Sequence, residues 1–129
     1  MILLVATMVE AGTPGPTDRV LQYYIHLNDR DYAAAWRLKS QAARGKQSLQ
    51  AFQKNWANCT SVGFFRGPEV QSQDARSAVV NYVIQAVDQL PGNKLKYGTY
   101  RLKTTLVREG GAWRYNGPQI LDRGLSLVA

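Results

Sequence analysis

The sequence is poor in the residues that most often build metal and redox sites. It contains one cysteine, Cys59, and one histidine, His26, in 129 residues. A single cysteine excludes an internal disulfide and a cysteine-rich metal site. Zinc sites need three or four clustered ligands, which one histidine and one cysteine do not supply without several carboxylates. We therefore predict neither a metal nor another cofactor.

Sequence motifs of known catalytic sites are also missing. There is no GxSxG, HExxH, CxxC or glycine-rich phosphate loop. His26 falls in an amphipathic pattern and is interpreted as a solvated or partly packed side chain. A proton-abstracting enzyme would need a carboxylate set against an apolar wall. The carboxylates near predicted strand ends are Glu69, Asp88 and Asp122, and Asp88, in the segment DQLPGN, is expected to be exposed. No acid and base form a pair, so we predict no catalytic residue.

Acidic residues are scarce relative to basic ones. The chain has 16 Lys and Arg against 9 Asp and Glu, a net charge of +7 and a pI near 9.8. Such a balance favours contact with an anionic partner. Six basic residues lie on the last two predicted strands, where Glu109 is the single acid that opposes them. The basic-surface candidates are Arg76, Arg101, Lys103 and Arg114.

Exposed aromatic residues are too few for a typical nucleic-acid platform. Sheet proteins that bind nucleic acid usually interleave exposed rings with basic residues. Here most rings are predicted to face inward, and Tyr97 is the main exposed candidate. This pattern argues against a nucleic-acid partner and favours a solvated basic face or attachment to an anionic surface.

Long hydrophobic runs are absent except at the N-terminus. Residues 1–9 are apolar, too short to span a bilayer as a helix. The run is similar to the apolar core of an export signal, but no basic residue precedes it. It could equally pack on the domain or end a longer upstream anchor. We predict a boundary after residue 16, with a Pro/Gly linker before a domain over 17–129. An export signal or anchor would make the domain extracytoplasmic or membrane-anchored, and otherwise it is cytoplasmic.

The rest of the sequence is that of one folded domain. Hydrophobic residues make up 45% and charged residues 19%, which is sufficient for a core. Apolar residues at helical spacing predict two consecutive helices over 20–36, with a polar kink at 28–30. A third helix should begin after Ser48 and bury Leu49, Phe52 and Trp56. Residues 40–47 are polar and are predicted to be an exposed loop.

Alternating residues replace the helical pattern near Thr60. Strands are predicted over 60–65 (interrupted at Gly67 and resumed at 69–71), 75–90, 94–108 and 112–115, the last continuing to 121. Gly98 is expected to form a bulge or bend, and Gly110 a tight turn. Helices followed by an antiparallel meander predict an α+β fold.

These segments carry a resemblance to a known family. The stretches YYIHLNDRDYAAAW, SLQAFQKNW and VREGGAWRY, over about residues 17–122, resemble a nuclear transport factor 2-like domain. The sequence departs from the family in one respect. The family usually has a small residue followed by proline after the second helix, whereas here Gln41 follows Ser40. The resemblance implies three helices packed on the concave face of a bent antiparallel sheet, which gives the cystatin-like cone. Its functional implications are broad: ketosteroid isomerase-like and epoxide hydrolase-like enzymes, and non-enzymatic modules of bacterial envelope and secretion proteins.

Aromatic residues gather on the predicted inner faces. Such rings could line a pocket for an apolar ligand or simply fill the core, and we favour the core. All three tryptophans are predicted to be mostly buried. The pocket-lining or core-lining candidates are Tyr24, Trp36, Phe52, Trp56, Tyr82, Tyr100 and Trp113.

We predict a non-catalytic bacterial binding module, extracytoplasmic, whose partner is a protein or an anionic envelope component. The alternative is a small isomerase-like or hydrolase-like enzyme that uses the cone as a pocket. An open cavity with a buried carboxylate would favour the enzyme, and a cone plugged by tryptophans would favour the module. A homodimer through the outer sheet face is also possible, because Val79, Val83 and Val87 form an apolar row there.

Overall fold

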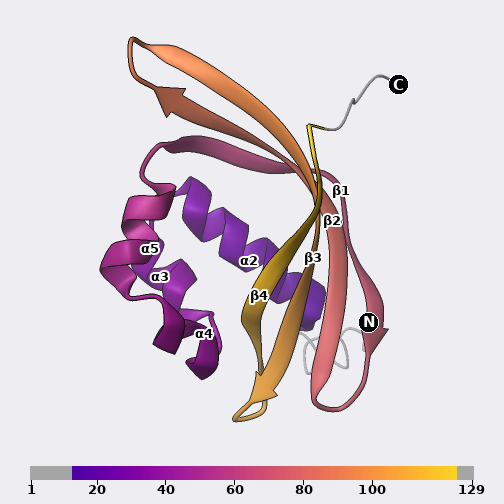
Figure 1. The fold of residues 1–129 in the computed structure, drawn as a ribbon. Helices are drawn as coiled ribbons and strands as arrows, with labels where there is room; N and C mark the ends of the chain where they lie inside the picture. The colour runs from indigo at the N-terminus through magenta and orange to yellow at the C-terminus, as the bar shows by residue number, and fades with distance from the viewer. Residues whose placement is uncertain (1–12, 125–129) are drawn as a thin grey trace, which may run out of the picture.

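The computed structural model describes residues 13–124 as a curved antiparallel sheet with its helices on one side (Figure 1). The strands follow one another in the order β1-β2-β3-β4, each antiparallel to the next. The elements are α2 (Pro16–Asn28), α3 (Tyr32–Arg37), α4 (Gln41–Lys46), α5 (Leu49–Trp56), β1 (Cys59–Gln73), β2 (Ser77–Leu90), β3 (Lys94–Glu109) and β4 (Ala112–Arg123). The predicted α+β class is confirmed. The apolar run over residues 1–9 lies outside the described part.

Helix α2 buries the stripe that its sequence predicts. Val20, Tyr23, Tyr24 and Leu27 are at most 5% exposed, because residues three and four apart share one helix face. The helix begins at Pro16, close to the expected start near Thr17 or Asp18. The Asp18 carboxylate accepts a hydrogen bond from the Gly15 amide at 2.8 Å.

The end of α2 is tied to the edge strand by Asn28. Its side-chain amide donates to the Val62 carbonyl, and its oxygen accepts from the Val62 amide at 2.7 Å. The predicted kink follows, with Arg30 in the left-handed region at φ 59°. Asp31 then caps α3 by accepting from the Ala34 amide at 3.1 Å.

The prediction of an exposed loop over residues 40–47 is wrong. Ser40 is fully buried and caps the short helix α4 by accepting from the Ala43 amide at 3.1 Å. Its hydroxyl also donates to Asn116 Oδ1 on β4 at 2.6 Å. None of the residues within α4 is buried, so the segment has no apolar stripe from which a helix could be predicted.

The sheet is more continuous than the sequence indicates. β1 runs unbroken through Gly67, and register shifts between Phe64 and Glu69 take up the irregularity. The predicted bulge at Gly98 is wrong, because β2 and β3 pair in regular register throughout. A Cβ at position 98 would overlap the ring of Tyr100. Glycine at this position therefore leaves room for the Tyr100 side chain, which folds back over it on the inner face of the sheet.

The core lies between α2 and the concave face of β2, β3 and β4. The predicted inner row of β2 is buried, from Ala78 at 1% to Ala86 at 9% exposure. Trp113 is 2% exposed, as predicted. Trp36 and Trp56 are less buried than Trp113, but both pack against the core, which agrees with the prediction that they are mostly buried. Within residues 13–124, no helix is long and apolar enough to cross a membrane.

Candidate functional site

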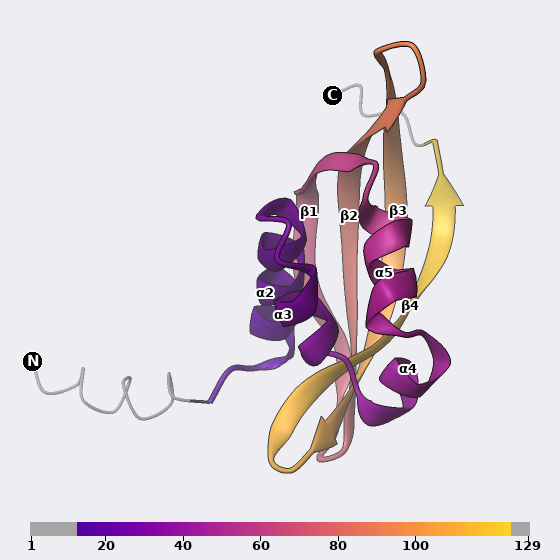
Figure 2. The same cartoon turned by 90° about the vertical axis from the view of Figure 1, so that its left-hand side faces the viewer.

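A cavity of about 420 Å³ separates helices α2 and α5 from the sheet. Its walls are mainly aromatic and aliphatic: Tyr23, Tyr24, Phe52, Trp56, Ile84, Tyr100, Leu102 and Tyr115. Its exposed lining residues lie on α5 and on the second half of β4, namely Asn55, Pro118, Ile120 and Arg123. The mouth therefore opens between α5 and the second half of β4. In Figure 2, where the helices face the viewer, α5 lies in front of the β3–β4 side of the sheet and α2 in front of the β1 side.

The structure brings four of the seven aromatic candidates into this cavity. Tyr24, Phe52, Trp56 and Tyr100 line it. Tyr82 lies beneath it in the core, and Trp113 packs elsewhere in the same core. Trp36 faces the helix surface, where its indole nitrogen donates to the Gln47 carbonyl at 3.0 Å. Trp56 is the single tryptophan among the described residues that lines the cavity. The three tryptophans therefore do not plug the cone, and the cavity is open.

Tyrosine hydroxyls are paired with one another in the core beneath the cavity. The hydroxyls of Tyr24 and Tyr82 lie 2.9 Å apart, and Tyr82 also bonds with Thr104. Beside them the ring of Tyr23 stacks on that of Tyr115, with centroids 3.9 Å apart. These residues come from α2, β2, β3 and β4, so only the tertiary fold assembles them.

Burial fixes the protonation state of these phenols. It raises the pKa of Tyr23, Tyr24 and Tyr82 well above the usual value of 10.0, and it also raises the pKa of Tyr115. The cause is desolvation, which disfavours the phenolate. At neutral pH the four side chains can donate and accept hydrogen bonds, but they do not act as bases.

Replacing Tyr82 by phenylalanine should reduce stability by about 1–3 kcal/mol. The hydroxyl stands between Tyr24 and Thr104, so its removal leaves two buried groups short of a partner. Urea unfolding of Tyr82→Phe against wild type measures the loss. Phe64→Leu, which changes a neighbouring ring without touching a hydrogen bond, is the control for packing. No loss beyond that of the control would show that the hydroxyl chain is not stabilising.

Lys39 lines the inner end of the cavity, a position that the sequence did not predict. The backbone on either side of it is fixed to β4: the Tyr115 amide donates to the Leu38 carbonyl and the Ser40 amide to the Tyr115 carbonyl, both at 2.8 Å. Lys39 is 9% exposed. Its ammonium donates to Gln47 Oε1 at 3.2 Å and lies 4.4 Å from the centroid of the Phe52 ring. Burial lowers its pKa.

Asp88 also lies in the cavity wall, which corrects the expectation that it is exposed. It is half-buried and stands opposite Cys59 in the β1–β2 register. Burial, and then the charge of Asp88, raise the pKa of the Cys59 thiol, which donates to the Ser61 carbonyl at 3.3 Å. The thiol is therefore a weak nucleophile. His26 does not line the cavity. Among residues 13–124, no cluster of His, Cys, Asp and Glu could hold a metal.

Solved structures share this architecture at low sequence identity. A nuclear transport factor 2-like protein with a cystatin-like fold from Novosphingobium aromaticivorans matches at a TM-score of 0.62 and 15% identity, over 92% of this chain and 88% of that one. The chain has the nuclear transport factor 2-like fold. A scytalone dehydratase-like protein from the same organism matches at 0.57 and 13% identity, over 98% and 91% of the two chains. A SEC-C motif containing protein from Rhodopseudomonas palustris matches at 0.63 and 10% identity, over 84% and 80%.

The likeness extends to the fold and no further. No protein-family model matches the sequence, and no curated protein matches it. One of these neighbours is named as a dehydratase, so proteins with this fold include enzymes. The activity of this cone has to be argued from its own residues.

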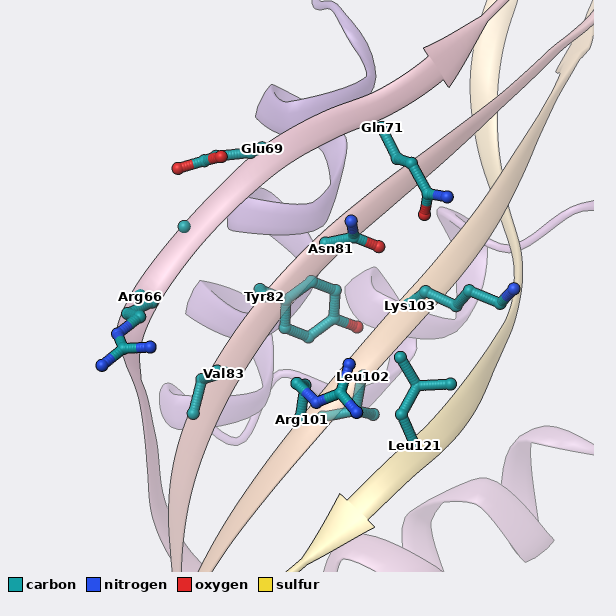
Figure 3. Close-up of a pocket in the computed structure, with 11 residues that line it drawn as sticks. Arg66, Glu69, Gln71, Asn81, Tyr82, Val83, Arg101, Leu102, Lys103 and Leu121 are labelled. Atoms are coloured by element: carbon teal, nitrogen blue, oxygen red, sulfur yellow. The ribbon is translucent and has the colours of Figure 1, made fainter. Parts of the chain in front are cut away.

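Several charged side chains lie on the outer face of the sheet, the face opposite the helices. A hollow of about 460 Å³ there is lined by Arg66, Glu69, Asn81, Val83, Arg101 and Lys103, among others (Figure 3). Arg101 forms an ion pair with Asp122 on β4 at 2.6 Å. The expectation that Glu109 alone opposes the strand cations is therefore wrong.

The four basic-surface candidates do not share one patch. Arg101 and Lys103 flank the outer hollow, while Arg76 lies in the turn before β2. Arg114 donates to the Arg37 carbonyl at the end of α3, at 3.0 Å. Val83, in the predicted apolar row, is only 7% exposed. It stands in register between Arg66 and Arg101. The outer-face dimer and the anionic partner stay predictions.

Proposed function

We propose that this nuclear transport factor 2-like domain is a non-catalytic module that binds a small, largely apolar ligand inside its cone. The observation that carries the proposal is the open cavity of about 420 Å³ with mainly aromatic and aliphatic walls. Small-molecule sites are typically concave and apolar, with a few placed polar groups. An extracytoplasmic location and a protein or anionic envelope partner are part of the same proposal.

The polar groups of the cavity support binding better than proton transfer. A general acid and a general base must lie within reach of the same substrate atom. The tyrosines remain protonated, and the described carboxylate in the wall is Asp88. Asp88 belongs to the Cys59 end of the sheet, whereas Lys39 lies beside Tyr115. No pair of titratable groups therefore faces one reacting centre.

One observation favours an enzyme as the second candidate. Asp88 is a half-buried carboxylate in the wall of an open cavity, which is the arrangement that a proton-abstracting isomerase or hydrolase would use. In that case turnover would depend on Asp88, and Asp88→Asn would abolish it while ligand binding persisted.

A neutral hydrophobic fluorophore tests the cavity directly. We expect N-phenyl-1-naphthylamine to bind the wild-type protein with increased fluorescence, because its rings match the aromatic walls. Ala86→Phe adds a ring inside the cavity and should weaken binding at least about tenfold, or 1.4 kcal/mol. Val87→Phe places the same ring on the opposite face of β2 and is the matched control. Equal binding by both variants, or no binding by wild type, would contradict the proposal.

A further inference from the structure

Among residues 13–124, the buried cation at the inner end of the cavity has no anionic neighbour. The partners of the Lys39 ammonium are the neutral Gln47 amide and the Phe52 ring. The ion pair found among residues 13–124 lies on the outer face, between Arg101 and Asp122. Lys39 is 9% exposed, and the backbone on either side of it is hydrogen-bonded to β4. The charge is thus fixed in place and faces the cavity.

Such a charge is costly unless an anion joins it. A buried ammonium loses its hydration, and an amide oxygen with an aromatic ring compensates for only part of that loss. The lowered pKa of Lys39 reports the same cost. An anionic group inside the cavity would form a charge-assisted hydrogen bond at this point.

The arrangement of charge along the sheet leaves this end open to an anion. Lys39 lies beside Tyr115, which pairs with Leu106 on β3. Asp88, the carboxylate in the wall, pairs with Lys96 near the far end of β3. An anion at Lys39 is therefore separated from Asp88 by most of the length of the strands. Arg123, at the mouth, adds a second positive charge.

We propose that the ligand of this cavity is an aromatic carboxylic acid, whose carboxylate accepts hydrogen bonds from Lys39 and whose rings lie among Phe52, Trp56 and Tyr100. The inference rests on the proposed function of the cavity as a ligand site and names the chemical class of the ligand. The 420 Å³ volume is within the ordinary range for small-ligand pockets.

The experiment compares 2-naphthoate with its neutral isostere 2-naphthamide, each displacing N-phenyl-1-naphthylamine. With wild-type protein we expect the acid to bind about 10–100-fold more tightly, the range of a hydrogen bond to a charged group. Lys39→Met should remove this preference, and Lys39→Arg should retain part of it. Lys54→Met removes the same charge from an exposed position on α5 and should leave the preference unchanged.

The outcomes separate the two proposals. If the fluorophore binds but wild type does not discriminate acid from amide, the carboxylate assignment is overturned and the apolar ligand site stands. The wild-type comparison needs no variant, so it remains decisive even if Lys39→Met does not fold. If Arg123→Met rather than Lys39→Met abolishes the preference, the assignment of Lys39 is overturned. If the fluorophore itself does not bind, the ligand site fails and this inference fails with it.

Discussion

Trp113→Ala is expected to lower the free energy of unfolding by about 3–5 kcal/mol. The indole is 2% exposed on the inner face of β4, just after the β3–β4 turn. The guanidinium of Arg108 lies 4.5 Å from the centroid of its ring. Truncation removes a large buried apolar surface, a cation–π contact and the support of the hairpin, and the surrounding strands cannot collapse into the space.

Trp36→Ala and Trp56→Ala are the matched controls. Both side chains are half-buried, one at the helix surface and one at the cavity wall. Each keeps part of its surface in contact with water, so each truncation should cost less than that of Trp113. Urea unfolding of the three variants measures the order. Equal losses at all three positions would mean that Trp113 has no special place in the core.

Alkaline pH is expected to destabilise the protein steeply, beginning near pH 10. Tyr23, Tyr24 and Tyr82 have raised pKa values when folded, because burial opposes the phenolate. In the unfolded chain they ionise near the ordinary value of 10.0. Above that pH the folded state holds more protons than the unfolded state, so stability falls as pH rises. Each phenol contributes about 1.4 kcal/mol per pH unit, and three together about 4.

Lys39 acts in the opposite direction. Its pKa is lowered in the folded state, so the unfolded chain binds more protons at this position and stability rises as pH approaches the ordinary lysine value of 10.5. The net fall is therefore steepest above that value. Urea midpoints measured from pH 8 to pH 11.5 give the slope.

Tyr23→Phe isolates the tyrosine contribution. It removes one buried phenol from the stack with Tyr115 and should reduce the alkaline slope by about 1.4 kcal/mol per pH unit. An identical slope in this variant would show that the buried phenols do not cause the alkaline loss.

Local patterns were sufficient for the elements with a strong period. The i, i+3, i+4 stripe of α2, the start of α5 after Ser48 and the alternation of β2 all match the structure. Each depends on residues a few positions apart, whose geometry is fixed by the helix or strand itself. The exposure of Tyr97, at 73%, follows from the same alternation.

The errors fall where a residue's environment comes from distant parts of the chain. α4 has no apolar stripe, and its cap Ser40 is buried because Asn116 lies against it. Asp88 looked exposed beside a turn, but it lies in the wall of a cavity that residues of α2, α5 and β4 complete. Gly98 looked like a bulge, but it makes room for the Tyr100 ring.

The sequence by itself determined the α+β class, the switch from helices to strands and the surplus of positive charge, because these are properties of composition and short-range period. Only the tertiary structure decided that the cone is open, that Tyr23, Tyr24, Tyr82 and Tyr115 meet in the core beside the cavity and that Lys39 lines it. Those features join α2, the segment after α3 and three strands. The spacing of these residues along the chain does not indicate that they are in contact, because the curvature of the sheet and the packing of the helices on it bring them together.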